Sequence, residues 1–315
     1  MLGNNLLLKA LPLLGALLLC GCENKPSGAA ATATDTNRQL FQVKGLLKEL
    51  KPNGKTVVIA HEEIPDYMVA MTMDFDVKDK NELKGLQPND YLAFQMVVTK
   101  DDGWIENLRK IPALAPADAG KIITLGSTND TNVGPVTFRK SPIVEPLSLG
   151  DKVPDYKFTN QFGTPISLAQ YQGRALGVTF IFTRCPFPTF CPRMSQFFQK
   201  AQTALKAQPN TNWSLLSLSF DPAWDTPERL LRYSTPYNLD SNHWQFATSD
   251  LWTVDGFSEQ VGLTFYRATP TALPEHNLRT LVIDAKGRLQ KIFLGNEWTP
   301  EEFAEEMLKA AAAVK

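Results

Sequence analysis

The sequence predicts an α/β domain in its second half, preceded by a small all-β domain. Short apolar segments separated by turn residues follow one another from Leu40 to about Ile111, whereas strand and helix patterns alternate from Leu147 onward. Between them, PALAPADAG and GSTNDTNVGP are rich in Pro, Gly, Ala and polar residues, which is typical of a linker. At 315 residues the chain is long enough for two domains of ordinary size.

Two hairpins define the all-β part. LFQVKGLLKEL and TVVIA flank the turn KPNG, which contains Asn53 and Gly54. YLAFQMVV and WIENLRKI flank TKDDG, with Asp102 and Gly103 at the turn. We therefore expect a small all-β barrel over residues 39–112.

The second half begins with RALGVTFIF, a continuous apolar run typical of a central strand covered on both faces. After Cys191, one helical face carries Met194, Phe197, Phe198, Ala201 and Leu205. WSLLSLS predicts a second strand, and DTPERLLRY predicts a helix with Thr226 at its N-cap. LRTLVID and RLQKIFL predict a hairpin, and Thr299 with Glu302 forms a capping box for the last helix. This order predicts a thioredoxin-like α/β domain.

Charge argues against one class of partner. Lys and Arg number 32 and Asp and Glu number 33, and no stretch gathers five or six basic residues. We therefore expect no nucleic-acid partner.

The N-terminus resembles the signal peptide of a bacterial lipoprotein. Its apolar run, Ala10 to Leu19, is too short to span a membrane and matches the apolar region of a secretory signal. The following LCGC resembles a lipobox in which Cys22 receives the lipid, a role that Cys20 does not fit. The alternative is an ordinary signal peptide with a chance cysteine pair. We expect residues 1–21 to be a lipoprotein signal peptide and residues 22–38 a flexible tether that holds the protein in the periplasm, lipid-anchored to a membrane.

A methionine cluster marks the all-β part. The segment HEEIPDYMVAMTMDF contains His61, Met68, Met71 and Met73. Met71 and Met73 are two residues apart, so on a strand their thioethers point to the same face. Thioether and imidazole together select Cu(I) or Ag(I) over hard cations. The alternative is that these methionines belong to the barrel core.

The segment MTMDF with its upstream histidine is similar to the CusF-type periplasmic copper-binding domain, a small OB-like barrel. Members of that family bind Cu(I) with a histidine and the two methionines of M-x-M, and often cap the metal with a tryptophan. The resemblance implies His61, Met71 and Met73 as ligands. Met68 takes the place of the tryptophan, where it can act as a further ligand.

Cys185 and Cys191, in TRCPFPTFCPRM, are the two cysteines of the mature part. In an oxidising compartment such a pair tends to form a disulfide unless a metal or a reductant prevents it. Cys185 is expected to end the central strand. Cys191, just before Pro192, is expected at the helix N-cap, where the helix dipole lowers the pKa of a thiol. A structural disulfide, a thiol–disulfide reductase and a metal site all remain open, whereas a peroxidase is disfavoured by Phe182 and Pro188, where peroxiredoxins place Thr or Ser.

The second half also resembles the Sco/SenC family of copper-insertion proteins, which have a thioredoxin fold. The resemblance rests on FIFTRCPFPTFCPRM, SLSFDPAWDTPERL and HNLRTLVIDAKGRL, within residues 146–315. It implies that Cys185, Cys191 and His276 bind one copper ion, as Cu(I) or also as Cu(II). The family has three residues between the cysteines, whereas this chain has five.

Four other polar or sulfur-containing residues have weaker signals. Asp221 and Asp225, in DPAWDTP, resemble a family motif near the metal loop, although turn formation and helix capping explain them equally well. His243 has no companion ligand nearby in the sequence, and we expect it to be structural. Met194 is expected in the helix core.

The combined pattern predicts a membrane-tethered periplasmic copper metallochaperone. In this hypothesis the Met-rich barrel captures Cu(I) and passes it across a linker, residues 113–145, to the Cys/His site. That site would deliver copper to the apo copper subunit of cytochrome c oxidase or to another periplasmic copper acceptor. Two alternatives remain: a thiol–disulfide reductase that keeps oxidase cysteines reduced, and a copper buffer. The first hypothesis does not require catalysis in the strict sense.

Overall fold

The computed structural model describes residues 38–112, 144–209, 212–266 and 273–313. All of these residues belong to one compact unit, residues 37–315. The predicted signal peptide, Cys20, Cys22 and most of the predicted tether and linker lie outside the described residues. Within the described ranges, every helix is too short or too polar to cross a membrane.

The first part of the described chain, residues 38–112, forms an antiparallel sheet, which we call the five-stranded region. Its strands are β1 (Gln39–Leu50), β2 (Thr56–His61), β3 (Met71–Asp76), β4 (Tyr91–Val98) and β5 (Gly103–Lys110), in the order β3-β2-β1-β4-β5. A 3-10 turn, η1 (Lys80–Leu83), lies between β3 and β4. The edge strands are connected by a parallel bridge between Val77 and Ile105. The all-β prediction is therefore confirmed, as a sheet whose edges meet at a bridge rather than as a continuously paired barrel.

Both predicted hairpins are confirmed. In the first, the Asn53 side-chain oxygen accepts backbone hydrogen bonds from Lys55 and Thr56, both 3.0 Å long, and Gly54 has a φ of +68°. This left-handed conformation favours glycine, because it crowds a Cβ atom. In the second, the Thr99 hydroxyl accepts the Asp102 N–H at 2.9 Å.

The remaining described residues, 144–313, build a second sheet, which we call the seven-stranded region. Its strands are β6 (Lys157–Asn160), β7 (Pro165–Ser167), β8 (Ala175–Ile181), β9 (Trp213–Ser219), β10 (Trp244–Thr248), β13 (Arg279–Ile283) and β14 (Leu289–Leu294), in the order β14-β13-β8-β9-β10-β6-β7. β8, β9 and β10 run parallel, and β13 and β6 pair antiparallel on either side. A separate two-stranded ribbon pairs β11 (Phe265–Tyr266) with β12 (Glu275–His276).

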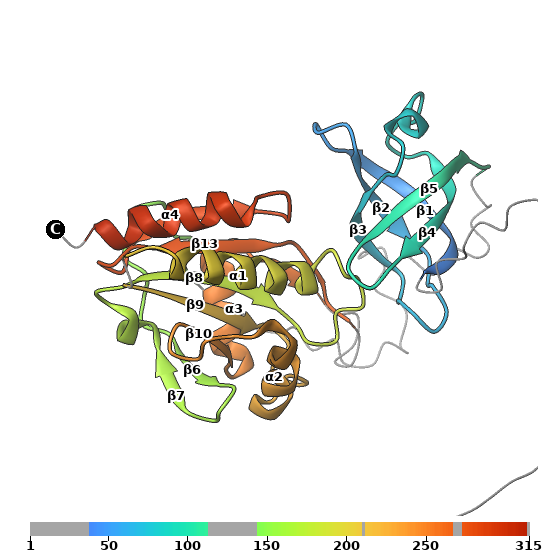
Figure 1. Ribbon diagram of the computed structural model, residues 1–315. Helices are drawn as coiled ribbons and strands as arrows, with labels where there is room; N and C mark the ends of the chain where they lie inside the picture. Colours follow the sequence, from blue (N-terminus) through green and yellow to red (C-terminus); the bar gives the residue numbers. More distant parts are fainter. Residues whose placement is uncertain (1–37, 113–143, 210–211, 267–272, 314–315) are drawn as a thin grey trace, which may run out of the picture. The chain divides into compact units, whose positions relative to one another are not determined.

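Helices cover both faces of this sheet (Figure 1). They are α1 (Cys191–Lys206), α2 (Pro227–Ser234), α3 (Leu251–Gln260) and α4 (Pro300–Ala312), with the 3-10 turns η2 (Leu168–Tyr171) and η3 (Thr235–Tyr237). A Cβ atom at Gly177 would lie 2.5 Å from Phe303 of α4, so glycine in β8 lets that helix pack close to the sheet. Phe180, on the opposite face of β8, contacts Phe257 of α3 with ring centroids 5.6 Å apart. The result is a three-layer α/β/α arrangement.

Local sequence signals set the helix ends. The Thr226 hydroxyl accepts the Arg229 N–H at the start of α2, and Thr299 and Glu302 form the predicted reciprocal capping box at α4. β8 is buried along its whole length, as its apolar run predicts. Strand β10 and helix α3 were not predicted from the sequence.

Candidate metal centres

Strand pairing brings together the predicted ligands of the five-stranded region. His61 on β2 lies directly opposite Met71 on β3, and Met73 pairs with Ile59 two positions along. Met71 and Met73 therefore share one face of β3. A tight turn returns Met68 to Ile64, with backbone hydrogen bonds of 2.7 and 2.9 Å between these two residues. Met68 and Met73 are buried and Met71 is half-buried, so the methionines belong partly to the core, as the alternative interpretation held.

The His61 ring is arranged as a ligand with a free lone pair. Its Nδ1 donates a 2.7 Å hydrogen bond to the backbone carbonyl of Glu62, because a carbonyl oxygen can only accept. The hydrogen on Nδ1 leaves Nε2 as the unprotonated nitrogen, and Nε2 is buried without a hydrogen-bond partner. Burial lowers the pKa of His61, which favours this neutral form. A buried, unpartnered acceptor nitrogen across from a thioether is chemically suited to a soft cation.

The cysteine loop and the helix after it both start earlier than the sequence predicts. Strand β8 ends at Ile181, and Cys185 lies in the loop four positions further on. Helix α1 begins at Cys191 itself, and Phe190 is its N-cap. The expected strand-end position for Cys185 and N-cap position for Cys191 are therefore both wrong. Both cysteines are free thiols, Cys191 fully buried and Cys185 half-buried.

The two thiols differ in acidity, in the opposite sense to the one predicted for Cys191. Burial, together with hydrogen-bond donation to Cys185, raises the pKa of the Cys191 thiol well above its usual value. Burial also opposes ionisation of Cys185, but hydrogen bonds from the Cys191 thiol and from the backbone of Cys191 and Phe187 lower its pKa overall. Cys185 is therefore the more acidic and more readily ionised sulfur.

A buried carboxylate fixes the start of the cysteine loop. Asp225 accepts the Thr183 N–H at 3.0 Å and the Ser219 hydroxyl at 2.6 Å, and it also accepts the Thr183 hydroxyl. Burial raises the pKa of Asp225, and these three donors partly offset that effect. Next to it, Asp221 pairs with Arg184 at 2.8 Å. Both aspartates thus support the residues immediately before Cys185.

His276 lies on β12 and has the same tautomer as His61. Its Nδ1 donates to the backbone carbonyl of Asn277 at 2.8 Å, which leaves Nε2 as the unprotonated nitrogen. Burial lowers the pKa of His276 to about 4, so the ring is neutral near pH 7. The rings of Phe182 and Phe220 pack against it, with centroids 5.5 and 4.9 Å away. His243 instead stacks on Trp213, and its Nδ1 donates a 3.0 Å hydrogen bond to the backbone carbonyl of that residue, which fits its expected structural role.

Most of the predicted ligands line a single cavity of about 380 Å³. The predicted ligands along its wall are Met68, Met71, Met73, Cys185 and His276. Cys191 and His61 are not among the residues that line it. Among the described residues, no three His, Cys, Asp or Glu side chains are close enough to hold a metal ion. The Cys185, Cys191 and His276 side chains are therefore near one another but are not gathered into a closed ligand set.

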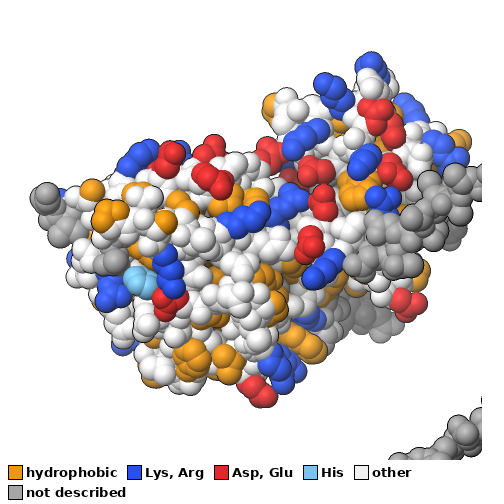
Figure 2. Space-filling view, in the orientation of Figure 1, with side chains coloured by type: hydrophobic (Ala, Val, Ile, Leu, Met, Phe, Trp, Pro, Cys, Tyr) orange, Lys and Arg blue, Asp and Glu red, His pale blue; other side chains and the backbone are white. Residues whose placement is uncertain are grey.

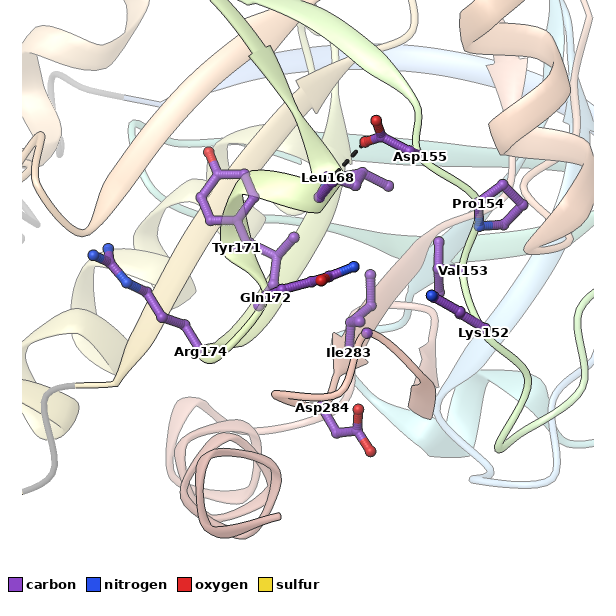
Figure 3. A pocket seen from close by; sticks show the side chains of 13 residues that line it. Lys152, Val153, Pro154, Asp155, Leu168, Tyr171, Gln172, Arg174, Ile283 and Asp284 are labelled. Atoms are coloured by element: carbon purple, nitrogen blue, oxygen red, sulfur yellow. Dashed lines mark hydrogen bonds between the residues drawn. The ribbon is translucent and has the colours of Figure 1, made fainter. Parts of the chain in front are cut away.

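A second cavity, of about 280 Å³, has a different chemistry. Its wall is formed by the segment before β6, the turn after η2 and the end of β13, and includes Lys152, Asp155, Tyr171 and Arg174 (Figure 3). No cysteine, methionine or histidine lines it. It therefore lacks the soft donors that distinguish the first cavity.

Basic and acidic side chains are interspersed on the surface shown in Figure 2. Near the cysteine loop, the Trp224 ring contacts two cations, with Arg229 at 4.0 Å and Arg184 at 5.2 Å from its centre. This surface contains both signs of charge, in keeping with the near-zero net charge of the chain.

Four residues that the sequence analysis did not single out shape these centres. Thr183 and Ser219 hydrogen-bond to the buried Asp225 carboxylate. The Tyr67 hydroxyl donates to the Pro186 carbonyl in the cysteine loop at 2.9 Å, and Phe187 is almost completely buried. The loop has two more residues between its cysteines than the family usually has. This extra length was the one feature of the sequence that could have indicated a special role for Phe187.

This thioredoxin-like sheet has one free cysteine in the loop before its first long helix, a second at the first residue of that helix, and a half-buried histidine nearby. These features define a class of thioredoxin-like thiol or metal-binding proteins. The chain belongs to the SCO1/SenC family, whose model matches residues 145–312. Residues 40–110 match the family model described as copper binding periplasmic protein CusF. Both predicted family resemblances are confirmed.

Three similar proteins each cover just over half of the chain. The SCO1 protein homolog of Bacillus subtilis is 30% identical over 183 residues, which is 55% of this chain and 88% of the relative. A SCO1/SenC family lipoprotein from Bacillus anthracis is similar in structure, with 25% identity, a TM-score of 0.47, and coverage of 54% of this chain and 99% of that one. BsSco, a member of the Sco family of cytochrome c oxidase assembly proteins in which a disulfide switch was identified, is 27% identical, with a TM-score of 0.46 and coverage of 55% of this chain and 99% of that one.

Proposed function

We propose that this protein is a periplasmic, membrane-tethered copper metallochaperone that binds Cu(I) at two sites and delivers it for assembly of the copper centre of cytochrome c oxidase. The observation that carries the proposal is the unpartnered Nε2 of His61, buried beside Met71 and Met73. An acceptor nitrogen buried without a donor is costly unless something binds it. A soft cation satisfies both that nitrogen and the thioethers.

The second site consists of Cys185, Cys191 and His276. Two thiolates and a neutral imidazole form a soft three-coordinate environment for Cu(I) and can also accept Cu(II). Membership of the SCO1/SenC family supports this assignment. Because Cys191 is buried and His276 lies on a separate ribbon, binding requires the loop to close around the metal.

The matched families support the proposed compartment and partner. Residues 40–110 match a family described as periplasmic and copper-binding, and BsSco belongs to a family of cytochrome c oxidase assembly proteins. We propose Cys22 as the lipidated residue, with residues 22–38 as the tether. The acceptor is the apo copper subunit of the oxidase or another periplasmic copper protein.

Copper stoichiometry tests the two-site proposal. The reduced chain is titrated with Cu(I) in competition with a chromophoric chelator, beside a Cys185→Ser/Cys191→Ser double variant. We expect two tightly bound copper ions, falling to one in the variant. One copper ion in both proteins would mean that the cysteines bind none, and it would contradict the proposed second site.

One observation favours a second function, thiol–disulfide reduction. Cys185 has a lowered pKa and receives a hydrogen bond from Cys191, as a nucleophilic cysteine does from its resolving partner. Reduction of a disulfide-bonded peptide from the oxidase subunit in the absence of copper would support this function. If that peptide is reduced only when copper is bound, or not at all, metallochaperone activity remains the sole proposal.

A further inference from the structure

The cysteine loop contacts the five-stranded region as well as its own sheet. Phe187, the second residue after Cys185, is 1% exposed and belongs to the hydrophobic core of the five-stranded region. Its ring lies 6.0 Å from that of Phe75, centre to centre, in an edge-to-face arrangement. A Cβ atom at Gly103 would lie 2.9 Å from the Phe187 ring, so the glycine leaves room for it.

Polar contacts surround this apolar insertion. The Tyr67 hydroxyl donates to the Pro186 carbonyl at 2.9 Å, and Arg193 of α1 pairs with Asp102 at 3.0 Å. On β12, the Glu275 carboxylate accepts a hydrogen bond from the backbone of Thr72, the residue between Met71 and Met73. These contacts place the methionine strand β3 alongside the histidine ribbon β12. Residues 37–315 accordingly form one compact unit.

The same contacts produce the cavity shared by the two donor sets. Three thioethers reach it from the five-stranded region, and the Cys185 thiol and the His276 imidazole reach it from the seven-stranded region. Every one of these donors is soft or borderline, and all are ligands that copper accepts. A metal ion leaving one set would thus find the other set of donors in the same cavity.

We propose that Phe187 is the docking element that holds the two regions together, so that Cu(I) passes from the thioethers to Cys185 inside this cavity without release into solution. The inference rests on the proposed copper-binding function and adds the route of transfer. It also explains the length of the loop. Five residues between the cysteines, in place of three, supply the reach that places Phe187 in the neighbouring core while Cys185 stays at the cavity wall.

The transfer is a ligand exchange in which copper remains Cu(I). A bond forms between copper and the Cys185 sulfur, and the thiol proton leaves to water. A bond between copper and a methionine sulfur breaks, and the thioether returns to the neutral state that it had before. Cys191 and His276 then replace the remaining donors, and Cys191 releases a second proton to water. No electrons are gained or lost at any step.

A pH jump measures the transfer directly. Full-length reduced chain is loaded with one equivalent of Cu(I) at pH 5, where thiols compete poorly for copper, and is mixed to pH 7.5. Absorbance of the copper–thiolate bond reports arrival at Cys185. We expect a rate that is constant over roughly a tenfold range of protein concentration and unaffected by a Cu(I) chelator in solution, because an intramolecular step does not depend on either.

Two substitutions act on the docking contact from opposite sides. Phe187→Ala removes the inserted ring, and Gly103→Val fills the space that it occupies. We expect each to slow transfer by roughly tenfold or more, because the local concentration of the acceptor falls. Phe162→Ala is the matched control, because this phenylalanine is exposed and does not line the cavity. We expect it to transfer copper at the original rate.

The outcomes separate this inference from the function on which it rests. A rate proportional to protein concentration, copper captured by the chelator in transit, or unchanged transfer in both Phe187→Ala and Gly103→Val would each overturn the docked route. In those cases two bound copper ions per chain would still uphold the metallochaperone function. Absence of any copper–thiolate absorbance in the unaltered chain would overturn both. Copper stoichiometry of the two variants shows that each site remains folded.

Discussion

The two candidate copper sites use the same histidine arrangement but differ in how their sulfur donors are held. In the five-stranded region, hydrogen-bonded strand pairing fixes His61 opposite Met71 and sets Met73 two positions further on. In the seven-stranded region, the sulfur donors lie on a loop and at the first residue of a helix. The first set is positioned by a continuous ladder, whereas the second depends on loop contacts made by Asp225.

The chemical difference follows the structural one. Thioethers carry no proton at any ordinary pH, and their positions change little when a strand is well paired. Thiols must lose protons to bind a metal, and a loop can open and close. The Met/His site is therefore suited to bind copper over a wide range of pH. The Cys/His site is suited to release copper to a partner.

The largest expected difference between the sites is in pH dependence. Burial lowers the pKa of His276 to about 4, so that ring stays neutral from pH 7 to pH 5. Burial also lowers the pKa of His61, which weakens proton competition at its ring. Each thiol proton displaced lowers the affinity roughly tenfold for each pH unit below the thiol pKa. From pH 7 to pH 5 we therefore expect the Cu(I) affinity of the Cys/His site to fall by about 10² to 10⁴, and that of the Met/His site to fall less, because it has no thiol proton to displace.

Competition with a chelator measures how the Cu(I) affinity of each site changes with pH, with one variant for each site. Cys185→Ser/Cys191→Ser isolates the Met/His site, and Met71→Leu/Met73→Leu isolates the Cys/His site. An equal change of Cu(I) affinity with pH in both variants would contradict the assignment of thiolates to one site only.

The next largest effect concerns the loop support. Asp225→Ala leaves three donors, from Thr183 and Ser219, without their buried acceptor, and each unsatisfied donor costs on the order of 1 kcal/mol or more. We expect the free energy of unfolding to fall by about 3 kcal/mol and the Cys/His site to bind Cu(I) more weakly. The Met/His site should keep its affinity.

Denaturant titration and copper competition check both parts of this prediction. Asp155→Ala is the matched control, because this exposed carboxylate accepts a single backbone hydrogen bond from Ala169. Its cost should stay below about 1 kcal/mol. Equal losses of stability in Asp155→Ala and Asp225→Ala would show that the buried network does not hold the loop.

The smallest effect on the fold is expected in the methionine site. Met73→Leu nearly conserves side-chain volume, so the free energy of unfolding should change by less than about 1.5 kcal/mol. The Cu(I) affinity of the Met/His site should nevertheless fall roughly tenfold, because a thioether is lost. Met96→Leu, at a fully buried methionine of β4 outside the ligand set, should leave copper affinity unchanged. If Met96→Leu lowers the affinity as much as Met73→Leu does, packing rather than ligation explains the loss.

Much of the fold could be predicted from local pattern. The Asn53–Gly54 turn, the buried strand β8 and the Thr299 capping box are all encoded within a few residues, and each was found where it was expected. Strand β10 was missed because its sequence, WQFAT, is short and follows a polar turn. Its identity depends on pairing with β9, which is a tertiary property.

The candidate sites were predicted less completely. Residue types and spacing pointed to the soft donors, but the relative acidity of Cys185 and Cys191 depends on which sulfur donates a hydrogen bond to the other, and this is set by burial. The role of Phe187 could not be predicted from the loop alone. Its partner residues Phe75 and Gly103 are distant in the sequence, and only folding brings them into contact.

The backbone acceptors of the two histidines have a consequence for how these sites tolerate mutation. Glu62 and Asn277 each provide a main-chain carbonyl rather than a side chain. A main-chain carbonyl survives every substitution at its position, so the ring orientation is inherited with the path of the backbone. Substitution at residue 62 or 277 therefore costs the side-chain hydrogen bonds made there, to Tyr91 by Glu62 and to Gly262 and Thr264 by Asn277, while each imidazole keeps its own acceptor and the same nitrogen available to the metal.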